Sequence, residues 1–312
     1  MFPSPARLYD AVMTTSRPAT SPVHAGRHRN ARLAAAASHT PSADGASSFG
    51  EHLRFWRRHR RLSQQGLALE AEVSTRHLSY VETGRSLPSR EMVMRLAGRL
   101  NVPLRERNAL LVAAGYAPMY RERVWSDATL APAHQAVALI LKSHEPYPAL
   151  AIDRHWILVC ANRMLPHLLE DVDPSLLQGQ VNVLRLSLHP LGLAPRIVNL
   201  GQWRNHIFER LRQQIHATGD SALTALLEEL RAYPVAENAG ADHLDGELLG
   251  VVMPFRLRTR HGVLSFISTT TVFGTPVDIT LRELALETFF PADAVTGEVL
   301  RGLQPRDGGS GL

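Results

Sequence analysis

Hydrophobic and polar positions recur at helical spacing from residue 49 to residue 114. In SQQGLALEAEVSTRHLSYVETGRSLP, residues 63–88, apolar side chains return every three or four positions along two short segments. This inward face comprises Leu67, Ala68, Ala71, Val73, Leu78 and Val81. Polar side chains occupy the outward face of the second segment, at Thr75, Arg76, Ser79 and Tyr80. The pattern predicts two short helices, joined by a tight turn, with separate core-facing and outward-facing surfaces.

Capping residues mark where these helices begin. Ser63 and Ser74 stand where a hydroxyl accepts a hydrogen bond from the first helical turn, and Ser89 has the same place before a later helix. The predicted helices cover 49–60, the two segments above, 90–100, and 104–114 with Gly115 as its end. Five helices of this size predict a complete small all-α core.

The spacing of the helix pair resembles a known DNA-binding motif. S-Q-x-x-L-A, a turn, S-x-x-x-L-S-x-V-E-x-G and then x-x-x-P resembles the lambda-repressor-like helix-turn-helix of the xenobiotic-response-element (XRE) family of regulators. A match at this many positions is much more specific than any single motif. In such domains the second helix lies in the major groove of DNA. The resemblance therefore implies sequence-specific DNA binding, with Ser74 to Glu82 as the recognition helix.

The same resemblance assigns roles to individual residues. It places Gln64 against a phosphate at the start of the first helix of the pair. It directs Thr75, Arg76 and Tyr80 to base edges, with Ser79 beside them. Arg76 is the best candidate for specificity, because arginine can donate two hydrogen bonds to guanine O6 and N7, worth about 1–3 kcal/mol of discrimination. The DNA-binding candidates that flank this face are Ser74, Arg85 and Arg90.

Several positions in this region leave alternatives open. Glu72 stands where the family often has a turn glycine, which predicts a non-glycine residue at positive φ. Arg57 and Glu82 occupy positions that form an ion pair in this fold, and a solvated pair of little energetic value is the alternative. For the arginines at 57, 58, 60 and 61, contact with phosphate and a simple solvated face are both open.

Charge is distributed unevenly along the chain. Residues 49–120 contain twelve arginines and six acidic residues, a net charge of +6. Residues 121–312 contain seventeen basic residues against twenty-one acidic residues, a net charge of −4. Because attraction to phosphates supplies most non-specific affinity for DNA, a basic N-terminal region is the expected electrostatic footprint of a DNA-binding domain.

Strand patterns appear after residue 132. YPALAIDRHWILVCAN, residues 147–162, predicts two apolar strands separated by a polar turn at Asp153 and Arg154, followed by a helix near 162–170. Helical spacing returns at 200–218 and 220–232.

A long hairpin is predicted over residues 248–274. It turns at His261 and Gly262, its returning strand is β-branched and aromatic, and Pro254 indicates an edge strand or a bulge. The predicted fold class is therefore α+β: an all-α N-terminal domain of five helices, followed by an α/β domain with antiparallel strands.

A second resemblance covers about residues 49–295. PLRERNALLVAAGYAPMY, then ALAIDRHWILVCAN, NVLRLSLHPLGL, the helix with Trp203 and the terminal hairpin are similar to XRE regulators that carry an MmyB-like ligand-binding domain. The family implies a PAS-like sensor whose apolar pocket holds a fatty-acid-like ligand. The pocket candidates on this analogy are Trp156, Val159, Asn162, Leu184, His189, Trp203, Phe255 and Phe266.

The pocket candidates have ordinary alternatives. For the apolar members the alternative is simple core packing. Asn162 and His189 are more informative, because an apolar pocket normally has a few polar groups that orient its ligand. His189, before Pro190, equally fits a role as a helix or loop cap.

Motifs for catalysis, cofactors or metals do not occur in the sequence. The fifteen histidines form no H-E-x-x-H, and there is no G-x-S-x-G, no phosphate-binding G-x-x-x-x-G-K-S/T and no G-x-G-x-x-G after a strand. The single cysteine, Cys160, excludes an intramolecular disulfide and lies in an apolar run, which predicts an inert buried thiol. We therefore expect no enzyme activity, no cofactor and no metal site.

Composition sets the expected domain boundaries. Residues 1–48 are rich in Ala, Ser, Pro, Arg and His without sustained periodicity, which predicts a disordered arm. A basic arm that adds DNA affinity, an over-long reading frame and an organelle transit peptide are its alternatives. The other expected parts are a DNA-binding domain at 49–120, a linker at 121–132, a ligand-binding domain at 133–300 and a flexible tail at 301–312. No apolar run approaches 18 residues, and the lone cysteine suits a reducing cytoplasm.

The resulting hypothesis is a cytoplasmic transcription regulator with double-stranded operator DNA and a small apolar ligand as partners. We expect a homodimer, because this mode of DNA binding favours inverted half-sites, one helical turn or a multiple apart. Two other classes remain open. One is an enzyme that acts on the apolar molecule and carries the helices as an accessory domain. The other is an antitoxin-like protein whose C-terminal domain captures a protein partner.

Overall fold

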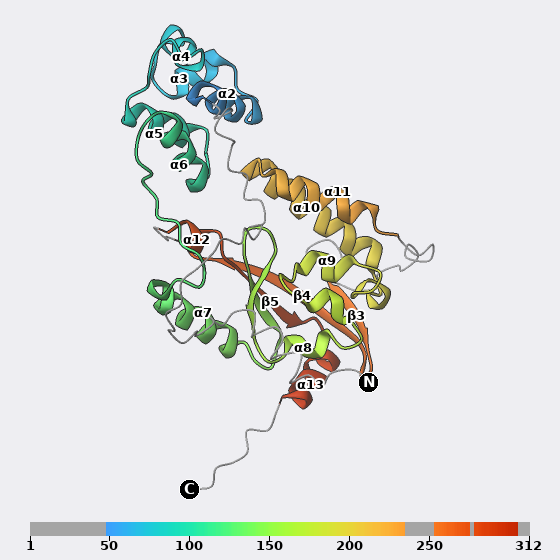
Figure 1. Ribbon diagram of the computed structural model, residues 1–312. Helices are drawn as coiled ribbons and strands as arrows, with labels where there is room; N and C mark the ends of the chain where they lie inside the picture. Colours follow the sequence, from blue (N-terminus) through green and yellow to red (C-terminus); the bar gives the residue numbers. More distant parts are fainter. Residues whose placement is uncertain (1–47, 235–252, 275–277, 305–312) are drawn as a thin grey trace, which may run out of the picture. The chain divides into compact units, whose positions relative to one another are not determined.

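Two compact units make up the protein, and the chain passes from one to the other between Glu122 and Arg123 (Figure 1). The computed structural model describes residues 48–234, 253–274 and 278–304. Apart from Ser48, the predicted N-terminal arm lies outside the described residues, as does most of the predicted tail. No helix in the described ranges is both long and apolar enough to cross a membrane.

The N-terminal unit consists of five helices around one core, as the sequence predicts. They are α2 (Phe49–His59), α3 (Gln64–Glu70), α4 (Thr75–Glu82), α5 (Arg90–Arg99) and α6 (Leu104–Ala113). Apolar positions at helical spacing from all five helices meet in this core, and the exposure of their side chains is 2 % or less at Trp56, Leu67, Leu78, Leu96 and Leu110. The predicted inward residue Val73 is only partly buried against this cluster.

Serine caps fix where three of these helices begin, as predicted. Ser63 Oγ accepts from the backbone N–H of Gly66 at 2.9 Å, and Ser74 Oγ accepts from that of His77 at 3.1 Å. Ser89 Oγ accepts from the backbone N–H of Met92 at 3.2 Å. Each bond satisfies a donor that has no partner within its helix.

The turn between α3 and α4 depends on a non-glycine residue in the left-handed region. Glu72 has φ 56°, which confirms the prediction made from its place in the motif. Left-handed backbone is sterically costly for residues other than glycine, so the flanking helices must hold this conformation. Ala71, fully buried before the turn, gives that packing.

A five-stranded antiparallel sheet forms the centre of the C-terminal unit. Its strands lie in the order β2-β1-β5-β4-β3. Their bounds are β1 (Ala149–Ile152), β2 (Leu158–Ala161), β3 (Phe255–Thr259), β4 (Gly262–Val272) and β5 (Ala285–Pro291). The fold class of the whole chain is thus α+β, as predicted.

The helices of this unit are mostly short. They are α7 (Ala131–Ser143), α8 (Leu165–Leu168), α9 (Val183–Leu188), α10 (Leu200–Thr218), α11 (Ser221–Ala232), α12 (Ile279–Arg282) and α13 (Ala294–Leu303). Three-residue to four-residue 3₁₀ turns lie at Ala128–Leu130, Pro174–Leu177 and Ala194–Arg196. The predicted helices at 200–218 and 220–232 are confirmed, whereas the helix expected near 162–170 is limited to α8.

Successive residues of the strands point to two different cores, because side chains alternate across a sheet. In β1, Leu150 and Ile152 join a large cluster with α8–α11, while Ala149 and Ala151 join a small cluster with Val137 and Leu141 of α7. The sheet therefore has a thick layer of helices on one face and α7 on the other.

The predicted hairpin is present in β3 and β4, whereas residues 248–252 of the predicted range lie outside the described residues. Thr259 pairs with Gly262, so the turn is Arg260-His261 and Gly262, at φ 102°, opens the returning strand. The strand that follows Pro254 is at the edge of the sheet, as expected from the missing N–H of proline. β5, which lies between β1 and β4 at the centre of the sheet, was not predicted from the sequence.

Arg123, the first residue of the C-terminal unit after the division, is bonded to α12. Its backbone N–H donates to Thr280 Oγ1 at 3.2 Å, its carbonyl accepts from the same hydroxyl, and its Nε lies 3.5 Å from Asp278 Oδ2. The stretch expected to be a linker is therefore attached to the C-terminal unit from its third residue.

Candidate DNA-binding surface and ligand-binding core

The outward face of α4 is accessible, as contact with DNA requires. Thr75 and Arg76 are exposed, and Ser79 and Tyr80 are half-exposed. Leu78 and Val81, on the opposite face, are buried. The flanking candidates Ser74, Arg85 and Arg90 are all exposed. The structure thus brings the eight predicted DNA contacts to the first turn of α3, to α4 and its flanks, and to the start of α5.

Two guanidinium groups lie near the ring of Tyr80 on this face. Arg76 Nε donates to Tyr80 Oη at 3.0 Å, and its guanidinium carbon is 5.4 Å from the centroid of the ring. The guanidinium carbon of Arg85 is 6.0 Å from the same centroid. Both distances fall within the range of cation–π attraction. Two positive charges are therefore concentrated beside one aromatic ring on the exposed face of α4.

A buried carboxylate fastens the end of α4 to α2. Glu82 accepts at Oε1 from Arg57 Nε at 2.6 Å and at Oε2 from Arg57 Nη2 at 2.9 Å, and its backbone carbonyl accepts from Arg54 Nη2 at 2.8 Å. The side chain of Glu82 is 0 % exposed and that of Arg57 is 11 % exposed. The predicted ion pair is confirmed, and the alternative of a solvated pair is wrong.

Electrostatics keeps this carboxylate charged. Burial by itself would raise the pKa of Glu82, but hydrogen bonds from Arg57 and Gln64, together with the charges of Arg57 and Arg54, hold the pKa below its usual value. A bidentate, charge-assisted pair is strong and directional. Glu82 therefore fixes the position of α4 against α2.

Gln64, the expected phosphate contact, also takes part in this network. Its Nε2 donates to Glu82 Oε2 at 2.7 Å. The amide is thereby oriented at the start of α3, and its second N–H hydrogen and its carbonyl oxygen are not used by that bond. The phosphate contact itself stays a prediction.

The arginine run in α2 and after it divides into two kinds of residue. Arg57 is occupied by Glu82, and Arg60 donates from Nε to the carbonyl of Leu100 at 2.9 Å and lies over the ring of Trp56 at 5.2 Å. Arg58 and Arg61 are exposed. Two of the four arginines thus stabilise the N-terminal unit rather than forming a solvated face.

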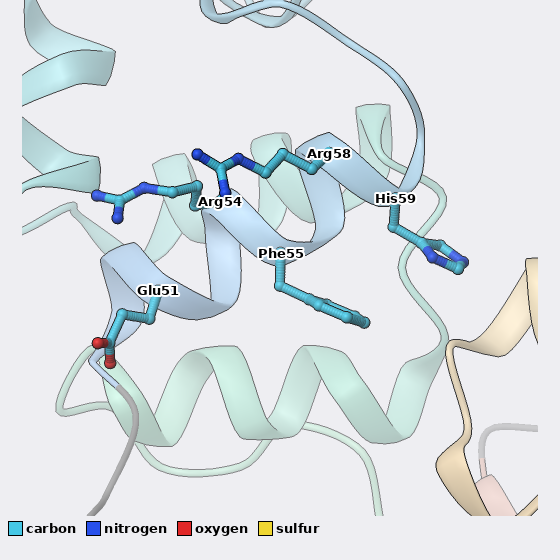
Figure 2. A pocket seen from close by; sticks show the side chains of 5 residues that line it. All are labelled: Glu51, Arg54, Phe55, Arg58 and His59. Atoms are coloured by element: carbon cyan, nitrogen blue, oxygen red, sulfur yellow. The ribbon is translucent and has the colours of Figure 1, made fainter.

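A shallow hollow follows the outer side of α2 and was not found from the sequence (Figure 2). Glu51, Arg54, Phe55, Arg58 and His59 line it. The ring of Phe55, 49 % exposed, stacks on His59 with centroids 5.6 Å apart. Of its residues, only Arg58 was considered in the sequence analysis, where contact with phosphate was left open for it.

Aromatic side chains fill the larger core of the C-terminal unit. The ring centroids of Trp203 and Phe255 are 4.8 Å apart, and those of Phe255 and Phe266 are 6.1 Å apart. Trp203 Nε1 donates to Ser187 Oγ at 2.9 Å, which satisfies a buried donor. The core joins α10 to β3 and β4 and is mainly apolar.

Family comparisons agree with both units. Residues 48–110 match the model of a helix-turn-helix domain, and residues 133–303 match that of the MmyB-like transcription regulator ligand binding domain. The second match covers more than half of the chain. This protein belongs to the MmyB-like transcription regulators. No curated protein matches the chain.

In this MmyB-like regulator, the structure brings five of the predicted pocket residues into one cluster. Trp156, Leu184, Trp203, Phe255 and Phe266 are all buried members of the large core. Val159 is not among them, because it packs against the small α7 cluster on the other face of the sheet. Val159 belongs to β2, and the register between β2 and β1 is irregular at Ala151 and Ile152. A one-residue change of register moves a side chain to the opposite face.

Both polar candidates of the MmyB-like regulator have partners within the protein. Asn162 is buried, and its Nδ2 donates to the carbonyls of Tyr147 at 2.7 Å and Leu141 at 3.2 Å. Its Oδ1 accepts from the backbone N–H of Ala149 at 3.1 Å. His189 Nδ1 accepts from the backbone N–H of Leu191 at 3.1 Å, which is a loop cap, the alternative given for this residue. These contacts give both residues structural roles.

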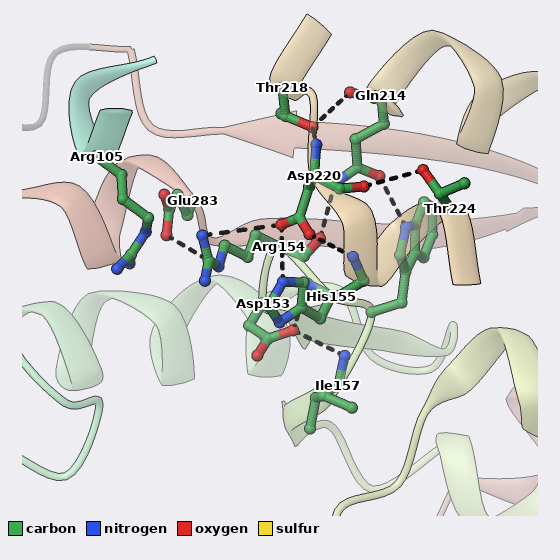
Figure 3. A network of polar contacts seen from close by, with 12 residues as sticks. Arg105, Asp153, Arg154, His155, Ile157, Gln214, Thr218, Asp220, Thr224 and Glu283 are labelled. Carbon is green, nitrogen blue, oxygen red and sulfur yellow. Dashed lines mark hydrogen bonds and ion pairs between the residues drawn. The ribbon is translucent and has the colours of Figure 1, made fainter. Parts of the chain in front are cut away.

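A polar network closes the turn between β1 and β2 (Figure 3). His155 Nε2 lies 2.9 Å from Asp220 Oδ2, and Gln214 joins the carbonyl of Arg154, at 2.8 Å, to Trp156 Nε1, at 2.8 Å. The hydrogen bond from His155 lowers the pKa of Asp220 to about 2, against the opposing effect of burial. Trp156, at φ 66°, is thereby held in left-handed backbone.

Arg210 and Glu287 form a further polar pair that the sequence analysis missed. Glu287 is 5 % exposed on the central strand β5, and its Oε1 accepts from Arg210 Nη2 at 2.6 Å. The guanidinium carbon of Arg210 is 4.7 Å from the ring centroid of Trp156. Only pairing between distant segments reveals this site, because β5 and α10 lie far apart in the sequence.

The described residues offer neither a metal site nor a reactive thiol. No three His, Cys, Asp or Glu side chains there are placed to hold a metal ion. Burial raises the pKa of Cys160 to about 11, so its thiol is not reactive at neutral pH.

Proposed function

We propose that this regulator binds operator DNA in a sequence-specific way as a cytoplasmic homodimer and responds to a small apolar, fatty-acid-like ligand. The observation that carries the proposal is the exposed polar face of α4, with two arginines at Tyr80, on a helix fixed from behind by buried Glu82. The family match supports transcription regulation in general. The ligand class, the dimer and the individual contacts belong to the proposal.

The exposure of these side chains supports the proposed DNA contacts. Thr75, Arg76, Ser79 and Tyr80 lie along base edges of the major groove, and Arg76 supplies most of the discrimination. Gln64, Arg85 and Arg90 contact phosphates, with Ser74 at the start of the recognition helix. Base contacts specify the sequence, whereas phosphate contacts fix the position of the protein.

Selection from a randomised operator pool tests these roles. We expect Arg76→Ala to relax base preference at one position, by about 5-fold to 100-fold, because a bidentate contact is lost. Gln64→Ala should weaken all sequences to a similar extent. An Arg76→Ala protein with full specificity would refute its assignment, and a wild-type protein that binds no duplex at low salt would refute DNA binding altogether.

The proposed ligand would occupy the apolar core around Trp156, Leu184, Trp203, Phe255 and Phe266 in one of two sensor arrangements. Such a ligand shifts their populations only through its different affinity for each. Its binding would change the spacing of the two DNA-binding units of the dimer.

Organic extraction of the purified protein, followed by mass spectrometry, tests the ligand class. An acyl chain recovered in stoichiometric amount is the expected result. Turnover of added acyl compounds would instead favour an enzyme, and co-purification of a protein partner without lipid would favour an antitoxin-like role.

A further inference from the structure

Building on the proposed DNA binding, we infer that Tyr80 is a positioning residue for Arg76. It acts on base recognition by holding the Arg76 guanidinium in the orientation that a guanine requires. The inference rests on the proposed function and adds a specific role for the tyrosine hydroxyl.

The contact between the two residues engages one end of the guanidinium. Tyr80 Oη accepts from Arg76 Nε at 3.0 Å. Within the described residues, no hydrogen bond or ion pair engages the two Nη nitrogens of Arg76. A guanidinium donates from a rigid, planar fork, so fixing Nε also fixes the direction of the Nη pair. The Nη pair is thus left to donate to O6 and N7 of a guanine.

Tyr80 is itself held firmly enough to serve this purpose. Its backbone carbonyl accepts from the N–H groups of Arg85, at 2.8 Å, and Ser86, at 3.2 Å, where the chain leaves α4. Its ring is half-buried, with Arg85 as a second cationic neighbour at 6.0 Å. An exposed arginine alone has many rotamers, and an orientation set before binding reduces the entropy lost on contact with DNA.

The spacing of the two residues explains how the contact forms. Positions four apart on a helix lie on the same face, so Arg76 and Tyr80 are neighbours once α4 has formed. Thr75 and Ser79, also four apart, lie beside them on α4, and the acceptor of the Arg76 Nε hydrogen bond is the hydroxyl of Tyr80.

Base-resolved selection with the full chain tests the inference. Wild type, Arg76→Ala, Tyr80→Phe and the double variant are each selected against a randomised operator pool. Phenylalanine keeps the ring and removes only the acceptor. We expect Tyr80→Phe to reduce preference by about 3-fold to 10-fold at the same base pair that Arg76→Ala affects, with no further loss in the double variant.

A matched tyrosine and a measurement without DNA complete the design. Tyr116, in the same unit, donates from its hydroxyl to the carbonyl of Pro88 at 3.0 Å, so Tyr116→Phe removes a hydroxyl away from α4. Base preference should be unchanged in Tyr116→Phe. In the free protein, the NMR signal of the Arg76 Nε–H group, assigned by its loss in Arg76→Lys, should shift in Tyr80→Phe and not in Tyr116→Phe.

The outcomes separate the inference from the function on which it rests. An unchanged preference at the base pair that Arg76→Ala affects, additive losses at that base pair in the double variant, or an unchanged Arg76 signal in Tyr80→Phe would each overturn the positioning role. Absence of specific binding by the wild type would overturn the proposed function itself.

Discussion

At the scale of single residues, Glu82 has the largest set of consequences. Its side chain is fully buried and receives hydrogen bonds from Arg57 and Gln64, so the charge is compensated within the protein. Removing one partner of a buried ion pair leaves the other charge buried without compensation. The resulting loss of folding stability is larger than the net stabilisation that the intact pair provides.

We therefore expect Glu82→Gln to destabilise the N-terminal unit by about 3–5 kcal/mol, because Arg57 then stays buried without a carboxylate. Thermal unfolding of the full chain, followed by circular dichroism, measures this change. Glu72→Gln is the matched control: Glu72 is 79 % exposed and lies 4.0 Å from Arg99, so its loss should have little effect. Equal effects of the two substitutions would contradict the role of Glu82.

The pH dependence of stability follows from the same residue. Because the pKa of Glu82 is lower in the folded state, its contribution is fully present above the ordinary glutamate pKa. That contribution is lost as the pH falls through the lowered folded-state pKa. We expect the free energy of unfolding of the wild type to fall across this acidic range. That of Glu82→Gln should fall less, because this variant lacks the contribution of the carboxylate already at neutral pH.

At the scale of elements, α2 and α4 approach each other at Gly50. A Cβ atom at this position would lie 2.3 Å from the backbone carbonyl oxygen of Glu82. The obstacle is backbone rather than a flexible side chain, so the two helices would have to separate. This close approach is what allows Arg54 and Arg57 to reach the end of α4.

Gly50→Ala should accordingly destabilise the N-terminal unit by about 1–3 kcal/mol through overpacking. Gly98→Ala, in α5, should instead stabilise the N-terminal unit. Nothing lies within 4 Å of its added Cβ, and alanine is favoured over glycine in helices by about 0.5–1 kcal/mol. Chemical denaturation of the two variants and the wild type measures both changes in the free energy of unfolding. A stabilised Gly50→Ala protein would show that the helices do not meet as described.

The elements also show how far local pattern predicts a fold. The helices around Ser63, Ser74 and Ser89 were predicted because caps and apolar spacing are local signals. β5 was missed, since LETFF becomes a central strand only by pairing with β1, more than a hundred residues away, and with β4, 15 to 23 residues away. The packing of Val159 against the small α7 cluster was not predicted, because the irregular pairing of β1 with β2 cannot be seen in the sequence.

At the scale of the whole molecule, the N-terminal and C-terminal parts of the chain carry net charges of opposite sign. The net charge of +6 in residues 49–120 contrasts with −4 in residues 121–312. Counterion release makes DNA binding by a basic surface strongly dependent on salt. The proposed phosphate contacts can thus be counted from the slope of affinity against salt concentration.

Arg90→Ala should weaken binding similarly for all sequences and reduce that salt slope by about 1, because one phosphate contact is lost. Arg231→Ala is the matched control: its Nη1 lies 2.6 Å from Glu228 on α11, outside the proposed surface. Fluorescence anisotropy with a labelled operator, from low to moderate salt, measures both. An unchanged slope in Arg90→Ala would remove this residue from the proposed phosphate contacts.

The sequence by itself determined the helix-turn-helix, its caps, the basic N-terminal region and the α+β class. These properties depend on interactions between residues a few positions apart, or on composition. Tertiary structure alone decided that Arg54 and Gln64 join the Arg57–Glu82 pair, that Asn162 is bonded to the backbone of Ala149, and that Glu287 meets Arg210 on the central strand. Each of these contacts joins groups whose meeting depends on the packing of whole elements, and a periodic pattern contains no information about which distant element packs against which.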